Sequence, residues 1–149
     1  MLINLYFGDY CNDGHGRYHH VCIEAPSEEL VIKAKEKIEK DYPKFFKQFA
    51  YRYMDNSIGP QVEEALLTAN YPIERFIEYQ DDIKYDDFTS LKELFDSEIW
   101  ENDEHRIHSI DLVADATIWM LNYYGAKAKE ITCPKAPTIT FTAGYGLFN

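Results

Sequence analysis

The sequence predicts one α+β domain over residues 1–149, with an N-terminal β-hairpin joined by a C-terminal strand into a small antiparallel or mixed sheet. Apolar and polar residues alternate at 2–7 and again at 17–24, which is typical of half-buried strands. A β-branched, alternating stretch follows at 138–142. Because a lone hairpin is only marginally stable in water, we expect this stretch to join it, with a cluster of about five helices packed against the sheet.

The size and composition of the chain are those of a folded domain. A chain of 149 residues buries roughly 68–70% of the surface that its unfolded form exposes, which suffices for a core. Apolar residues make up 46% and charged residues 28% of the sequence, a composition that excludes wholesale disorder. There is neither an apolar run of ~18 residues nor a secretory signal, so we expect a cytoplasmic protein with no membrane partner.

Turn residues fill the loop between the two N-terminal strands. Asn12, Asp13 and Gly14 favour tight turns, and Gly16 adds a further flexible position. Backbone N–H groups in such a loop can also hold an anion. One alternative function is therefore a small-molecule or anion-binding module at this loop, with Asp13, Gly14, His15 and Gly16 as its ligand-binding residues.

Capping residues and prolines indicate where the helices begin and end. Ser27 is suited to cap a helix that Pro43 interrupts. Pro60 fits the first turn of the next helix, and Pro72 starts another. Apolar residues at helical spacing predict a further short helix over 88–99.

The longest and most apolar helix is expected over residues 103–124, with Gly125 well placed at the position after its end. At about 100° per residue, its polar side chains fall in one narrow stripe, which either faces solvent or lines a buried polar site. These polar residues are Glu104, His108, Asp111, Asp115 and Asn122.

Part of this stripe has the spacing of a metal site. Two carboxylates and an imidazole on adjacent turns are spaced to share one divalent cation. Asp111, Asp115, His108 and Glu104 are therefore candidate metal ligands, and Mg²⁺ or Mn²⁺ is the ion expected there. Elsewhere the sequence predicts no cofactor. The alternative is an ordinary solvent-facing stripe.

The eleven residues from Asp111 to Leu121 resemble the acidic helix of the all-α nucleotide pyrophosphohydrolases. The resemblance implies that Asp111 and Asp115 would hold Mg²⁺ against a nucleoside triphosphate. The second acidic motif of that family has imperfect counterparts here in Glu63-Glu64 and in Glu74 with Glu78. The two N-terminal strands depart from an all-α fold.

Negative charge is concentrated in one part of the chain. There are 26 acidic and 15 basic residues, giving a net charge of −11, and residues 74–104 alone contribute 12 acids against 3 bases. An acidic face over this stretch repels nucleic acid and favours a basic protein surface. Its predicted partner-binding residues are Glu78, Asp81, Asp82, Asp86 and Asp87. The alternative is a solvated face that aids solubility.

Two further predictions concern the oxidation state of the cysteines and the packing of the C-terminal tail. Cys11, Cys22 and Cys133 are expected to be reduced thiols, with Cys22 packed in a strand. Leu147 and Phe148 must pack on the protein's own body or on a partner, for which a homodimer is the simplest arrangement.

Three function classes follow from these patterns. The first is a small, acidic, non-catalytic interaction or regulatory protein that presents residues 74–104 to a basic partner. The second is a divalent-metal-dependent hydrolase of a nucleotide-like phosphorylated small molecule, using Asp111 and Asp115. The third is the loop-based binding module. The sequence favours the first and leaves open whether any site is catalytic.

Overall fold

The computed structural model describes residues 1–10, 18–46, 58–79, 88–101, 110–131 and 138–144. Its sheet contains β1 (Leu2–Tyr10), β2 (Tyr18–Glu24), β3 (Lys129–Ile131) and β4 (Thr138–Gly144), in the spatial order β3-β2-β1-β4. Strand β1 runs antiparallel to β2 and parallel to β4, and β3 runs antiparallel to β2. The predicted α+β class is confirmed, and the sheet is mixed.

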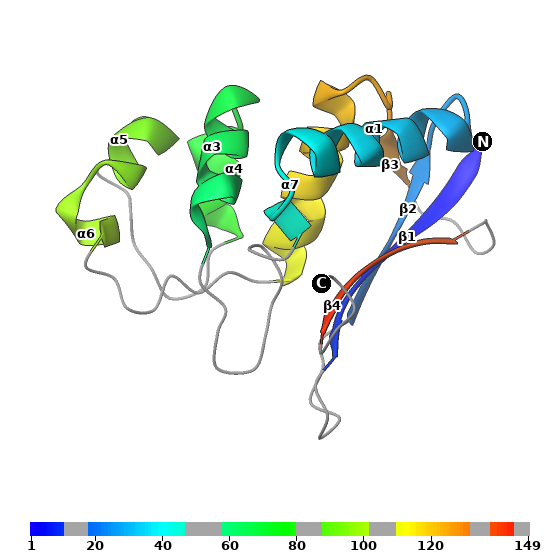
Figure 1. Ribbon diagram of the computed structural model, residues 1–149, viewed down its shortest axis with the longest axis horizontal. Helices are drawn as coiled ribbons and strands as arrows, with labels where there is room; N and C mark the ends of the chain where they lie inside the picture. Colours follow the sequence, from blue (N-terminus) through cyan, green and yellow to red (C-terminus); the bar gives the residue numbers. More distant parts are fainter. Residues whose placement is uncertain (11–17, 47–57, 80–87, 102–109, 132–137, 145–149) are drawn as a thin grey trace.

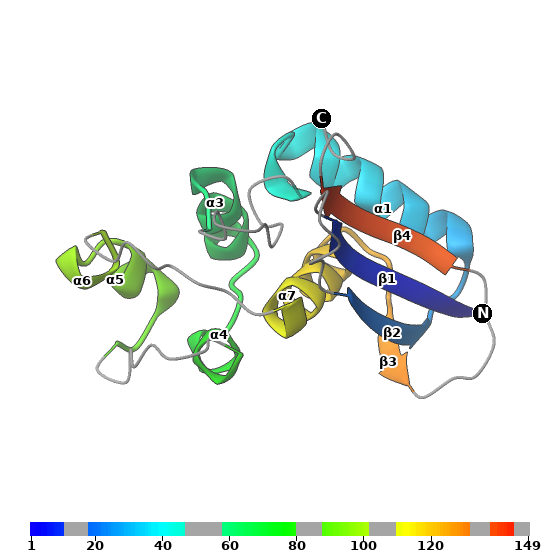
Figure 2. The same cartoon turned by 90° about the horizontal axis from the view of Figure 1, so that it is seen from below.

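The described helices lie between β2 and β3 in the chain. They are α1 (Glu28–Asp41), α3 (Pro60–Thr68), α4 (Ile73–Glu78), α5 (Leu91–Phe95), α6 (Glu98–Glu101) and α7 (Ile110–Tyr123). Helices α1 and α7 lie beside the sheet, whereas α3 to α6 extend to the other end of the molecule (Figures 1 and 2). We call residues 58–79 and 88–101, which carry α3 to α6, the helical lobe.

The core lies between the sheet and helices α1 and α7. Alternate residues of β1 point toward the helices, and these residues, Ile3, Leu5 and Phe7, are at most 1% exposed. Phe7 stacks on Phe141 of the neighbouring strand β4, with ring centroids 5.1 Å apart. Helix α7 contacts α1, β1, β2 and α3, so it connects the sheet to the helical lobe.

Most of the local signals that we identified in the sequence are confirmed. The Ser27 hydroxyl accepts a hydrogen bond from the Leu30 amide at 3.2 Å, and α1 ends before Pro43. Pro60 occupies the first turn of α3. Cys22 is buried in β2.

Some expected boundaries differ from the structure. The single short helix predicted over 88–99 is in fact two helices, α5 and α6, separated at Asp96–Ser97. Ser97 separates them because its hydroxyl donates to the Leu94 carbonyl and accepts from the Trp100 amide. Strand β3 was not predicted, since three residues show too little alternation to be recognised.

Other expectations fall outside the described residues. These are the first residues of the long helix at 103–109, the thiols Cys11 and Cys133, and the tail residues Leu147 and Phe148. Within the described segments, no helix has the length and apolar character needed to cross a bilayer.

Helices α3 and α7 end in the same way, with a residue in the left-handed backbone region. Asn70 follows α3 at φ 53° and Gly125 follows α7 at φ 91°. In each case the amide of this residue and the amide of the next residue bond back to carbonyls in the last turn, which satisfies the helix end. The predicted role of Gly125 is confirmed.

We predict that Gly125→Ala destabilises the protein by about 1–2 kcal/mol, because a left-handed backbone disfavours any side chain. A Cβ atom at this position meets no atom within 4 Å, so the loss would come from the backbone alone. Urea unfolding of parent and variant measures it. The matched control is Lys127→Gly, which relieves a second positive φ, of 54°, and should not destabilise by more than about 1 kcal/mol. Equal stability of Gly125→Ala and the parent would contradict this assignment.

Candidate functional site

The most highly organised group of polar side chains surrounds Asp115 on α7. Asp115 is 9% exposed. Its Oδ2 atom accepts hydrogen bonds from the Tyr71 hydroxyl at 2.5 Å and from Arg75 Nε at 3.0 Å. Its Oδ1 atom accepts from Arg75 Nη2. Both oxygens of this buried carboxylate are therefore satisfied, as burial of a charge requires.

Trp119, one turn after Asp115, completes this group. The Arg75 guanidinium lies over the Trp119 ring, 5.9 Å from its centroid, and the Tyr71 ring meets it edge-on at 5.7 Å. The Trp119 indole N–H donates to the Ala69 carbonyl at the end of α3, at 2.8 Å. We call Tyr71, Arg75, Asp115 and Trp119 the Asp115 cluster; it ties α7 to the start of α4.

Burial and nearby negative charge raise the pKa values of the two tyrosines near Asp115, Tyr71 and Tyr79. Burial raises the pKa of Tyr71, and its hydrogen bond to Asp115 raises it further. The pKa of Tyr79 is also raised, first by burial and then by the charge of Asp115. Both hydroxyls therefore remain protonated at neutral pH and are hydrogen-bond donors.

A small cavity of about 160 Å³ adjoins the Asp115 cluster. It is lined by Val21, Tyr79, Asp111, Ala114, Asp115, Ile118 and Glu130. Glu130 in β3 is in register with Ile23, so it lies on the sheet face that the helices cover. The fold thus adds a carboxylate from β3 to the two on α7.

Two of the four candidate metal ligands can be placed. Asp111 is exposed and Asp115 is buried one turn further along α7, while Glu104 and His108 lie outside the described residues. Among the described residues, no three His, Cys, Asp or Glu side chains form a group that could hold a metal ion. A cation next to Asp115 would compete with Arg75 for the same oxygens. The metal site stays a prediction.

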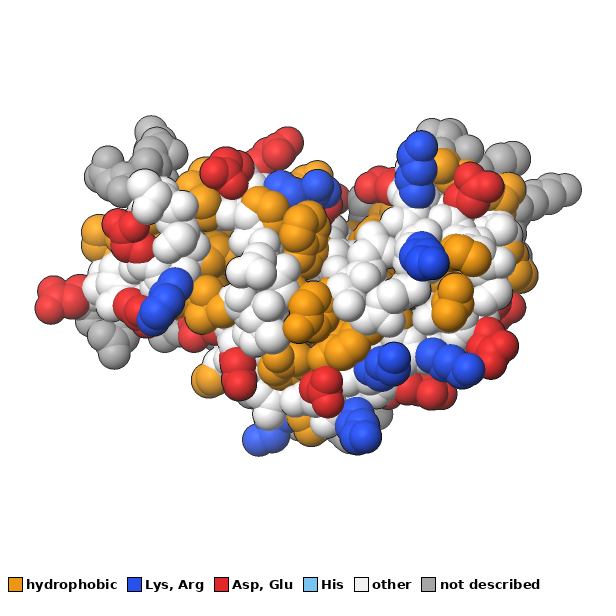
Figure 3. All heavy atoms as spheres, turned by 90° about the horizontal axis from the view of Figure 1, so that it is seen from above, with side chains coloured by type: hydrophobic (Ala, Val, Ile, Leu, Met, Phe, Trp, Pro, Cys, Tyr) orange, Lys and Arg blue, Asp and Glu red, His pale blue; other side chains and the backbone are white. Residues whose placement is uncertain are grey.

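The helical lobe carries most of the described excess of negative charge. Its described residues include eight Asp and Glu but only two bases, Arg75 and Lys92. Each base is already paired, Arg75 with Asp115 and Lys92 with Asp96 at 2.8 Å. Figure 3 shows carboxylates at the end of the molecule where Figure 1 places α5 and α6.

Only one of the predicted partner-binding residues lies in the described part of the lobe. Glu78 is exposed on α4. The others, Asp81, Asp82, Asp86 and Asp87, lie outside the described residues. The same is true of the loop residues predicted to bind a ligand, which are Asp13, Gly14, His15 and Gly16.

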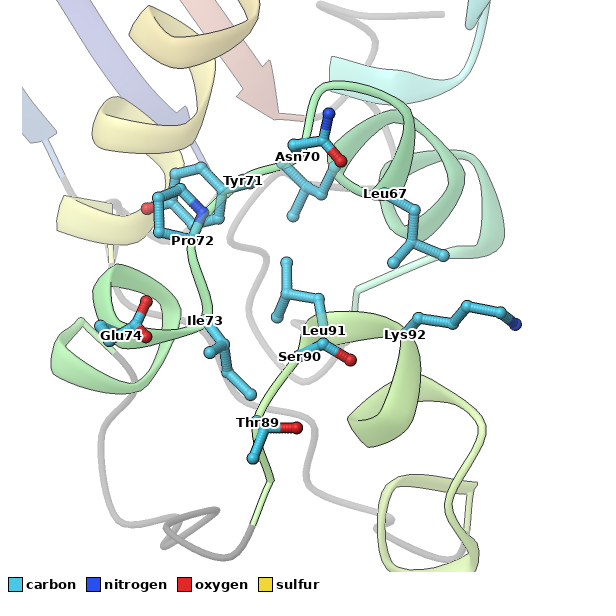
Figure 4. Close-up of a pocket in the computed structure, with 11 residues that line it drawn as sticks. Leu67, Asn70, Tyr71, Pro72, Ile73, Glu74, Thr89, Ser90, Leu91 and Lys92 are labelled. Atoms are coloured by element: carbon cyan, nitrogen blue, oxygen red, sulfur yellow. The ribbon is translucent and has the colours of Figure 1, made fainter.

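A larger pocket, of about 370 Å³, opens in the lobe between the end of α3, the start of α4 and the start of α5 (Figure 4). Its apolar wall consists of Leu66, Leu67, Tyr71, Pro72, Ile73 and Leu91. Its polar rim consists of Asn70, Glu74, Thr89, Ser90 and Lys92. The pocket therefore combines an apolar wall with a polar rim in a negatively charged part of the protein.

Around Asp115, the residues Tyr71, Arg75, Trp119 and Glu130 were not predicted from the sequence, and neither was the pocket in the lobe. Arg75 did carry a signal, because it is the only base between Arg52 and Lys84. A single cation in an acidic stretch of a folded protein is a candidate for a specific ion pair. Tyr71 and Glu130 carried no local signal, since their roles depend on contacts with distant parts of the chain.

We predict that Tyr71→Phe costs about 1.5–3 kcal/mol, because the variant loses a buried hydrogen bond to a charged group. The raised pKa of Tyr71 stabilises the fold fully below pH ~10, and this contribution is lost as the pH rises further. Urea unfolding between pH 7 and 11 should show a shallower alkaline decline for the variant. In the control Tyr124→Phe, which removes an exposed bond to Asp41, the cost at pH 7 should be below about 1 kcal/mol. Equal costs for the two variants would contradict the prediction.

Comparison of the chain with protein-family models, with curated proteins and with solved structures finds no match.

Proposed function

We propose that the chain is a small, non-catalytic cytoplasmic interaction or regulatory protein that presents its acidic face to a basic protein surface. The observation that carries this proposal is the charge of the helical lobe. The described part of the lobe has eight acidic residues, and both of its bases are held by carboxylates. The stretch from 74 to 104 has a net charge of −9, counted as 12 acids and 3 bases.

Arg75 pairs with Asp115, which lies on α7 outside the lobe, so this ion pair uses none of the lobe's own carboxylates. A cation held by a buried carboxylate contributes little outward field, so Arg75 does not offset the carboxylates of the lobe. Concentrated charge of one sign attracts an oppositely charged surface and accelerates its approach. The alternative reading, a solvated face that only aids solubility, predicts no such preference.

The proposal predicts binding of a basic peptide that weakens steeply with salt. A fluorescent 12-residue peptide of alternating Lys and Ser serves as the probe, with anisotropy measured at 20, 100 and 300 mM NaCl. Because the Debye length falls from about 20 to 6 Å over this range, we expect the Kd to rise at least several-fold. Glu74→Gln/Glu78→Gln should weaken binding at low salt.

The matched control for this experiment neutralises two exposed carboxylates outside the lobe, one on β2 and one on α1, in the variant Glu24→Gln/Glu36→Gln. It has the same change in net charge, so a specific acidic face predicts a smaller loss of affinity than for the lobe variant. Equal losses would indicate a general charge effect and contradict an acidic docking face. No binding of the peptide at 20 mM NaCl would overturn the proposal.

A metal-dependent hydrolase is the second candidate, and one observation favours it. Asp111, Asp115 and Glu130 line the same small cavity, but as they stand the three carboxylates do not form a group that could hold a metal ion. Asp111 and Asp115 are also the residues that the resemblance to nucleotide pyrophosphohydrolases implies as ligands of Mg²⁺. Occupation of this cavity by a cation would require Asp115 to exchange at least one of its bonds with Arg75.

Thermal unfolding with Mg²⁺ or Mn²⁺ decides between the two functions. A cation at 100 times its dissociation constant stabilises the fold by about 2.7 kcal/mol, which raises Tm by several degrees. If the hydrolase function holds, Asp111→Asn should abolish this rise, whereas Asp96→Asn, a matched change on the helical lobe, should retain it. If the interaction function holds, neither ion should change Tm by an amount that depends on Asp111.

A further inference from the structure

We propose that the pocket between α3, α4 and α5 receives a single large apolar side chain from the basic partner. That side chain lies in a short segment with Lys or Arg on both sides of it. This inference rests on the proposed function and adds how the partner is held. Figure 4 shows Leu67, Ile73 and Leu91 around the hollow, with Lys92 extending away from it.

The pocket offers a ligand both apolar and polar surface. Three polar groups of its rim are already bonded within the protein. The Thr89 hydroxyl donates to Glu93 at 2.8 Å, the Ser90 hydroxyl accepts from the Glu93 amide at 3.1 Å, and the Lys92 ammonium group is bonded to Asp96. The apolar wall can therefore take an apolar side chain, while the exposed carboxylate of Glu74 at the rim can accept a cation beside it.

The carboxylates around the pocket favour positively charged residues on either side of the side chain that occupies it. Glu74 lies at the rim and is exposed, and Glu78 is exposed one turn further along α4. Lys92 is the one base among the described residues that line the pocket, and it is ion-paired with Asp96. Charge complementarity thus favours an occupant carried between cationic residues and disfavours an anionic small molecule.

The pocket is large enough for one anchoring side chain. Its volume of about 370 Å³ is at the lower end of the roughly 300–1,000 Å³ that small-molecule sites span. Binding energy in protein interfaces is concentrated in a few apolar or aromatic anchors that fill such hollows. Burial of one leucine side chain is worth at least about tenfold in affinity.

The experiment uses the full chain and three labelled 12-residue peptides. The first alternates Lys and Ser with a central Leu, the second has Ala in place of that Leu, and the third keeps the Leu but has Gln in place of every Lys. We expect the first to bind about tenfold more tightly than the second, and the third to bind far more weakly than the first.

Two protein variants connect this preference to the pocket. Thr89 is exposed at the rim, so Thr89→Phe should place a ring at the mouth of the hollow and reduce the advantage of the Leu peptide over the Ala peptide. Thr89→Val removes the same hydroxyl without filling the pocket and should keep that advantage. Leu67→Ala shortens a half-buried wall residue and should reduce the advantage, so it replaces Thr89→Phe if that variant does not fold.

The outcomes separate this inference from the proposed function. If the Leu and Ala peptides bind equally well, both to the parent and to Thr89→Phe, the pocket does not hold the side chain and this inference is wrong. The proposed acidic docking face would be unaffected by that result. If no Lys peptide binds at low salt, the proposed function is wrong, and the inference about the pocket, which rests on it, is wrong as well. Equal binding of the Gln and Lys peptides, or a dimer in sedimentation that Thr89→Phe dissociates, overturns a basic occupant.

Discussion

The buried carboxylate of Asp115 is the interaction through which the two halves of this protein are joined. Helix α7 packs on the sheet through β1 and β2, while Tyr71 comes from the link between α3 and α4 and Arg75 from α4 itself. An unpaired carboxylate at this depth would be strongly unfavourable, so the helical lobe can dock on α7 only where both donors reach it. The position of the lobe is therefore determined by hydrogen-bond geometry as well as by apolar contact.

Inside the lobe, packing centres on the Trp100 side chain. The short helices of the lobe are held together by aromatic rings, with Trp100 lying 5.8 Å from Phe76 and 5.1 Å from Phe95. The Trp100 indole N–H donates to Glu63 at 2.6 Å, so one carboxylate of α3 also supports this packing. The lobe has eight carboxylates and two bases among its described residues, and one of the two bases, Arg75, is paired with Asp115.

The sequence was informative wherever a few neighbouring residues determine the structure. Ser27, Pro60 and Gly125 act through their own backbone or the next turn, and their roles were predicted correctly. Strand β3 could not be predicted, because its three residues are extended only through pairing with β2, more than a hundred positions earlier in the chain. The partners of Asp115 are 40 and 44 residues away, so periodicity on α7 identified the carboxylate but not what binds it.

The cavity beside Asp115 and the lobe pocket differ in what they can contribute to a specific complex. At physiological salt, charges act over a Debye length of about 8 Å, so an acidic surface attracts basic proteins in general. Apolar anchors in a shaped hollow supply much of the binding energy that selects one partner. The cavity beside Asp115 has about 160 Å³, and one of its carboxylates is already bound by Arg75 and Tyr71. The lobe pocket is more than twice as large, its wall is apolar, and its polar rim groups Thr89, Ser90 and Lys92 are bonded within the protein. A partner drawn to the lobe by charge would therefore gain its specificity at this pocket.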